Sequence, residues 1–209
     1  MIKSMSKHGA TLGVFAIACT AIVAIVAALT APIIAKQEAK KLLSTMEQLL
    51  PSDSYDNDLF NSCFLSQDTH LLGSELAQKT WIATREGQPV GLAIETVAPD
   101  GYSGNILLLV ALHYDGSIAG VRVLNHKETP GLGDKIDLHK SDWITRFNGL
   151  MVDNEKDPRW AVKKDGGDFD AFTGATITPR AVVKAVKRAV LYYQQHQATL
   201  YQQAANCES

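Results

Sequence analysis

The residues most suited to carry chemistry lie between positions 170 and 180. They read Asp170-Ala171-Phe172-Thr173-Gly174-Ala175-Thr176-Ile177-Thr178-Pro179-Arg180. Thr178 is expected to be the N-cap of a helix running from about Pro179 to about Tyr201, because apolar residues recur at helical spacing after it. The unpaired N–H groups and the dipole of its first turn would stabilise a nearby anion by roughly 1 kcal/mol. The pattern therefore indicates a phosphate site beside Thr176.

The composition of this segment agrees with that interpretation. Thr173, Gly174 and Ala175 are small, so a bulky group could approach Thr176. Arg180 would oppose the helix dipole, which a nearby anion would explain. On spacing alone, however, such a segment is more often a simple turn before a helix.

Other motifs offer no alternative chemistry, and we expect no catalytic residue and no metal site. Gly131-Leu132-Gly133 lacks the third glycine of a dinucleotide-binding fingerprint, because position 136 is isoleucine. There is no P-loop, no Gly-x-Ser-x-Gly elbow and no Cys-x-x-Cys. The histidines at 113, 126 and 139 lack the spacing of metal ligands.

The chain also contains one segment suited to a membrane. No charged residue occurs from Gly9 to Ala35, a length sufficient to cross a bilayer and about twice that of a signal-peptide core. We therefore expect an uncleaved single-pass anchor. Its short amino-terminal tail favours a body outside the cytoplasm, although the flanking lysines do not decide the orientation. A net charge of −2 argues against nucleic-acid binding.

The rest of the chain predicts an α+β domain with an antiparallel sheet. Asp115-Gly116 marks one hairpin and Glu86-Gly87 another, while the apolar run from Ile106 to Leu112 predicts a strand buried on both faces. Trp143 to Phe147 predicts a short amphipathic helix. The expected parts are a tail (1–9), an anchor (10–35), a stalk helix and linker (36–70), the domain (71–203) and a second tail (204–209). Whether Cys63 and Cys207 pair or stay free remains open.

Three motifs and the anchor together resemble the RnfG (RsxG) family, the G subunits of the Rnf ion-translocating electron-transport complex. The motifs are Gly101-Tyr102-Ser103-Gly104-Asn105-Ile106, His126-Lys127-Glu128-Thr129-Pro130-Gly131-Leu132-Gly133, and Asp170-x-x-Thr173-Gly174-Ala175-Thr176. The resemblance covers nearly the whole chain. It implies an FMN-binding domain shared with the C subunit of the sodium-pumping NADH:quinone reductase, in which Thr176 would carry FMN through a phosphoester bond.

The same resemblance implies roles for further residues. A magnesium-dependent flavin transferase would recognise the motif Asp170, Thr173, Gly174, Ala175 and Thr176, and the Thr176 hydroxyl would displace AMP from FAD. The other cofactor contacts implied are Glu128, Thr129, Gly131 and Leu132 on one wall, Tyr102 and Gly104 nearby, and Thr178 at the helix start.

The function implied is electron relay in the bacterial inner membrane, with the body on the periplasmic side. The partners would be the other Rnf subunits, and in some bacteria the complex would also keep the redox sensor SoxR reduced. The chain alone should not turn over substrate. Two alternatives stay open: a stand-alone membrane-anchored FMN reductase, and a flavin-free assembly or binding module in which Thr173 to Thr176 is only a turn.

Overall fold

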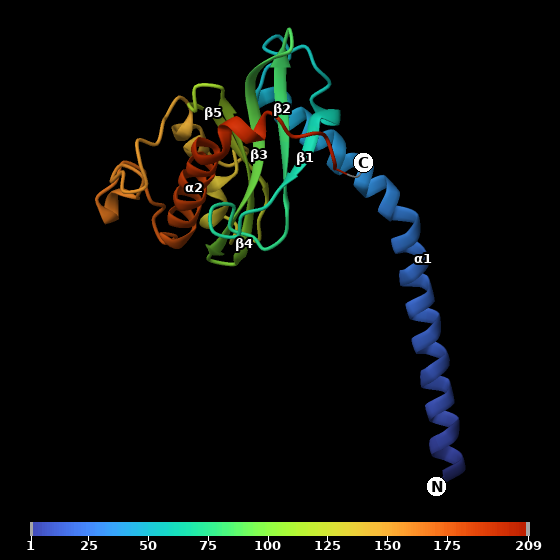
Figure 1. Ribbon diagram of the computed structural model, residues 1–209. Coiled ribbons are helices and arrows are strands. Elements are labelled where there is room, and N and C mark those ends of the chain that lie inside the picture. Colours follow the sequence, from blue (N-terminus) through green and yellow to red (C-terminus); the bar gives the residue numbers. More distant parts are fainter. Residues whose placement is uncertain (1, 208–209) are drawn as a thin grey trace. The chain divides into compact units, whose positions relative to one another are not determined.

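The computed structural model describes residues 2–207, with side chains from residue 8 onward. The chain divides into two compact units, Met1–Ser44 and Thr45–Ser209, which are described separately. Figure 1 shows the elements of both units.

The first unit consists of most of helix α1 (Ile2–Leu49), which contains Pro32. The helix is long and apolar enough to cross a membrane. Its uncharged run from Gly9 to Ala35 would extend over about 40 Å at 1.5 Å per residue. The anchor and the stalk helix, expected as separate segments, form one continuous helix, because the helical pattern of 36–49 follows without a second helix-breaking residue.

The second unit is built on a five-stranded antiparallel meander in the order β1-β2-β3-β4-β5. The strands are β1 (Cys63–Ser66), β2 (Gln78–Arg85), β3 (Gln88–Gly101), β4 (Gly104–His113) and β5 (Ile118–Asn125). Both hairpins expected from the sequence are present, and a third, at Tyr102-Ser103, joins them. The sheet starts before Leu71, the expected beginning of the domain, because β1 pairs with β2.

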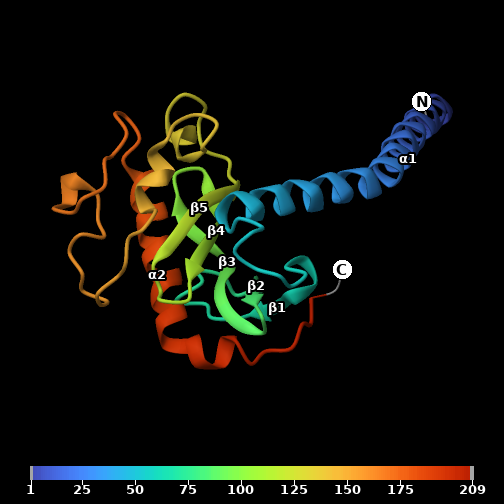
Figure 2. The same ribbon diagram turned by 90° about the horizontal axis from the view of Figure 1, so that it is seen from above.

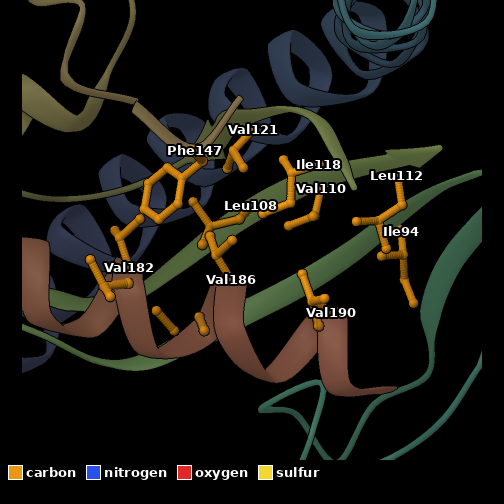
Figure 3. Close-up of a cluster of buried hydrophobic side chains, with 14 of the residues drawn as sticks. Ile94, Leu108, Val110, Leu112, Ile118, Val121, Phe147, Val182, Val186 and Val190 are labelled. Atoms are coloured by element: carbon orange, nitrogen blue, oxygen red, sulfur yellow. The ribbon is translucent and has the colours of Figure 1, made fainter. Parts of the chain in front are cut away.

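Helix α2 (Ile177–Leu200) lies across one face of this sheet (Figure 2). Its valines at 182, 186 and 190 point toward the strands, where they meet alternate residues of β4 together with Phe147 (Figure 3). These side chains form the main core, and each buried valine contributes on the order of 1.5–3 kcal/mol. The packing also fixes the direction in which the first turn of α2 points.

The opposite face of the sheet is covered in part by the end of α1, within the same unit. Ala93, Ala111 and Gly120 form a row of small residues across three strands of this face. A Cβ added to Gly120 would lie 2.6 Å from a methyl carbon of Leu49, so a side chain there would force Leu49 to shift. Leu109 and Ala111 are fully buried here, which confirms that β4 is buried on both faces.

The carboxyl-terminal tail returns to β1 and is bonded to it. Cys63 and Cys207 form a disulfide with a Cα–Cα distance of 5.5 Å, which answers the question left open by the sequence. The backbone N–H groups of Asn206 and Cys207 donate to the Cys63 carbonyl, and the Asn206 side chain accepts from the Leu65 N–H. The tail thereby covers the outer edge of β1, which would otherwise expose unpaired backbone groups.

Short 3-10 helices occupy the connections: η1 (Phe60–Ser62), η2 (Gly133–Ile136), η3 (Trp143–Phe147) and η4 (Lys163–Asp165). The helix expected at Trp143 to Phe147 is η3, a 3-10 helix whose aromatic residues are buried. The segment between η3 and α2 contains the motif from Asp170 to Thr176, which ends at the start of α2.

Candidate functional site

A pocket of about 280 Å³ lies at the amino-terminal end of α2. Three parts of the chain supply its walls: the β3–β4 turn, the loop before η2 and the start of α2. Its lining residues are Tyr102, Glu128, Thr129, Leu132, Gly133, Gly174, Ala175, Thr176, Ile177 and Thr178. The fold thus brings together segments that are more than seventy residues apart in the sequence.

Most of the contacts expected from the sequence line this pocket, but not all of them. Thr173, Gly104 and Gly131 are outside its lining, as is Asp170, which was expected only as part of the motif that the transferase recognises. Gly133 and Ile177 line it, although neither was among the expected contacts. A signal for Gly133 was present, since it closes the motif that contains Glu128. Nothing in the sequence marked Ile177 as a contact, because the expected roles at the helix start belonged to its neighbours Thr176 and Thr178.

The start of α2 corrects the expected cap. The helix begins at Ile177 and Thr176 occupies the N-cap position, whereas Thr178 was expected there. Thr178 is fully buried and its hydroxyl donates to Glu128, so that hydroxyl does not cap the helix. Pro179 falls inside the first turn, where its missing N–H costs no helical hydrogen bond.

Thr176 is the accessible hydroxyl at the start of α2. Its side chain makes no capping hydrogen bond, and the residue is half-exposed. Gly174, two residues earlier, has φ of 82°, a conformation that a side chain would strain. The turn closes by a hydrogen bond from the Ala175 N–H to the Phe172 carbonyl, at 3.0 Å. This turn places Thr176 at the amino-terminal end of α2.

Glu128 connects the three walls of the pocket. It is 5% exposed, and one carboxylate oxygen accepts the Ser103 N–H at 3.0 Å while the other accepts the Thr178 hydroxyl. A Cβ added at Gly133 would lie 2.7 Å from one of these oxygens. A Cβ added at Gly101 would lie 3.0 Å from the other and 2.3 Å from the Gly104 carbonyl oxygen, so a side chain at either position would force its neighbours to shift. The positions of the β3–β4 turn and of α2 are therefore coupled through one side chain.

An aromatic cluster supports the segment that leads to Thr176. The Trp143 indole N–H donates to the Asp170 carbonyl at 2.8 Å, and the Trp143 ring packs edge-on against Phe172 at 5.2 Å. Phe147 stacks on Phe169 at 4.6 Å. Trp160 lies against both rings of that pair. Aromatic rings of the core thus support the segment that leads to Thr176.

Asp170 and Arg180, at the two ends of the motif, are each paired with a charged residue of the same chain. Lys163 lies 2.7 Å from the Asp170 carboxylate and lowers the pKa of Asp170 through a hydrogen bond. Arg180 forms a two-pronged pair with Asp165, which lowers the pKa of Asp165. The anion that Arg180 was expected to require is therefore a carboxylate of the chain itself.

Two family models match the chain. The FMN-binding domain matches residues 101–191, a range that contains every residue of the pocket. The RnfG N-terminal region matches residues 1–49, the range of α1.

Relatives of known name are similar over the full length. The G subunit of the ion-translocating oxidoreductase complex of Shewanella piezotolerans is 54% identical over 100% of this chain and 98% of the relative. The G subunit of the same complex in Shewanella oneidensis is 52% identical, over 100% of this chain and 99% of the relative. That of Aliivibrio fischeri is 51% identical, over 100% of both chains.

Proposed function

The chain belongs to the family of G subunits of ion-translocating oxidoreductase complexes, and we propose that it relays electrons in such a complex through FMN bound covalently to Thr176. The observation that carries the proposal is the placement of Thr176. Its half-exposed hydroxyl lies at the start of a 24-residue helix, inside a pocket within the FMN-binding domain.

The start of α2 suits the phosphate of FMN. The phosphoester would leave one negative charge on the phosphate, beside backbone N–H groups that have no partner within the helix. The positive end of the helix dipole acts on the same position. The cation of Arg180 adds little there, since Asp165 already neutralises it.

The pocket suits partial enclosure of the flavin rather than complete burial. Its volume of about 280 Å³ is close to the lower limit of roughly 300 Å³ for small-molecule pockets. Apolar side chains of Tyr102, Leu132 and Ile177 line it and are exposed, so they could pack against a ring system. A shallow site of this kind holds a cofactor weakly, and a covalent bond at Thr176 would retain it. When bound, FMN supplies the electron-transfer chemistry, which the pocket side chains cannot provide.

Asp170 and Thr173 suit recognition by a flavin transferase. Both are exposed and lie outside the pocket lining, so an enzyme could contact them while Thr176 reacts. In that reaction the Thr176 oxygen would form a bond to the FMN phosphorus of FAD, the pyrophosphate bond would break, AMP would leave, and the transferase would accept the hydroxyl proton.

We further propose that α1 spans the inner membrane once and that the second unit lies on the periplasmic side. The disulfide between Cys63 and Cys207 supports this orientation, because disulfides form and persist in oxidising compartments. The other subunits of the complex and the flavin transferase are the partners that the proposal implies.

A variant of Thr176 tests the proposal. The full chain would be purified from cells that contain the flavin transferase, then examined on a denaturing gel under ultraviolet light and by intact mass. We expect a fluorescent wild-type band that carries one FMN, and no flavin on Thr176→Ala. The free energy of unfolding of Thr176→Ala should stay within about 0.5 kcal/mol of the wild-type value, because a half-exposed hydroxyl contributes little to stability.

Thr129→Ala is the matched control, since Thr129 is an exposed threonine of the same pocket. It should keep covalent FMN. Retention of the flavin in Thr176→Ala, or a wild-type protein without flavin, would contradict the proposal.

A further inference from the structure

Glu128 is a buried carboxylate that forms no salt bridge with any side chain described for residues 8–207. The salt bridges among residues 8–207 involve other carboxylates: Asp100, Asp153, Asp157, Asp165 and Asp170. Both Glu128 oxygens instead accept hydrogen bonds, from the Ser103 N–H and the Thr178 hydroxyl. The Ser103 N–H can only donate, and with Glu128 as a carboxylate the Thr178 hydroxyl donates to the second oxygen, so both oxygens of the ionised group are satisfied.

The surroundings are arranged to keep that negative charge in place. A buried ion without a partner is unfavourable unless hydrogen bonds and dipoles replace its hydration. Thr178 belongs to the first turn of α2, so the carboxylate lies beside the positive end of the helix dipole. Glycines at 101 and 133 leave the space that the two oxygens occupy.

We propose that Glu128 is a fixed negative charge that lowers the reduction potential of the flavin in this pocket. The proposal rests on the FMN at Thr176 proposed above, because Glu128 and Thr176 line the same pocket. An electron that reaches the flavin from another protein of the complex adds negative charge to the pocket. Repulsion by the carboxylate then raises the free energy of the reduced form relative to the oxidised form, which lowers the potential.

The direct test is the reduction potential of Glu128→Gln. Glutamine keeps the shape of the side chain and can keep both contacts: its carbonyl can accept the Ser103 N–H and its amide can donate to the Thr178 oxygen. Only the charge is lost. In a spectroelectrochemical titration of the flavinylated full chain in detergent, we expect a midpoint potential more positive than that of the wild type, with a similar melting temperature.

A further variant controls for loss of a carboxylate elsewhere in the domain. Glu95→Gln removes a carboxylate from the other face of the sheet, that of Ala93 and Ala111, and should leave the potential unchanged. A rise in Glu95→Gln equal to that in Glu128→Gln would overturn the proposal.

A shorter pair covers the case in which Glu128→Gln does not fold. Glu128→Asp and Glu128→Asn lose the same length, and only the first retains the charge, so the asparagine variant should have the more positive potential. Equal potentials within that pair, or an unchanged or more negative potential in a folded Glu128→Gln, would overturn the proposal. A wild-type protein without flavin would instead contradict the proposed function.

Discussion

Three threonines compete for the role of flavin acceptor, and their surroundings differ. Thr173 is exposed and outside the pocket lining. Thr178 is fully buried, and its hydroxyl is engaged with Glu128. Of these three threonines near the start of α2, Thr176 alone combines a place in the pocket lining with a half-exposed side chain. A nucleophile must be reachable by the enzyme that modifies it, so accessibility favours Thr176.

Asp170→Asn tests recognition by the transferase at the same scale. The substitution removes the charge of an exposed carboxylate, so we expect flavinylation to slow by about tenfold, as for loss of a charge-assisted contact of roughly 1.5 kcal/mol. The measurement is the rate at which purified transferase and FAD label the chain. Asp168→Asn, a neighbouring exposed acid, should be labelled at the wild-type rate. Equal rates for the two variants would argue against a role for Asp170.

At the scale of elements, the aromatic cluster and Glu128 together hold the segment that carries Thr176. The sequence allowed η3 and the two hairpins to be predicted, because their patterns are local. It did not reveal that Trp160, Phe169 and Phe172 join the aromatic cluster, since the residues around them resemble a surface connection.

Trp143→Phe tests this support. The variant leaves the Asp170 carbonyl without the indole donor and removes part of a buried ring, so we expect the free energy of unfolding to fall by roughly 1–3 kcal/mol. The measurement is chemical denaturation of the full chain. Trp160→Phe removes a similar volume from the same cluster, so the difference between the two variants reports the hydrogen bond. A Trp143→Phe protein as stable as Trp160→Phe would show that this bond contributes nothing.

The errors in predicting elements have a common physical origin. The start of α2 was placed two residues late because the local rule for Ser, Thr and Pro at helix starts could not include Glu128, fifty residues away. Strand β1 was assigned to a linker because it has only four residues and is held by β2 and by the tail. Both features depend on contacts between distant parts of the chain.

At the scale of the whole molecule, the chain combines a helix suited to a membrane with a flavin-binding domain closed by a disulfide. The disulfide joins residues 144 positions apart, so it links the first strand of the sheet to the end of the chain. Loop closure of this length should stabilise the domain substantially.

The double variant Cys63→Ser/Cys207→Ser tests that contribution. We expect a loss of about 2–4 kcal/mol of unfolding free energy, because the unfolded chain gains freedom when the cross-link is removed. Denaturation of both proteins gives the difference, and thiol labelling without reductant reports whether the wild-type bond is formed. Wild-type protein from the native membrane with both thiols reactive would count against the disulfide and the periplasmic orientation.

The most direct test of the account is to locate the flavin on the chain. Trypsin should release residues 165–180, a peptide that contains Thr173, Thr176 and Thr178 together. Fragmentation of this peptide by mass spectrometry assigns any added mass to one of the three. The account predicts the increment of one FMN on Thr176. An increment on Thr173 or Thr178, or an unmodified peptide from cells with an active flavin transferase, would contradict it.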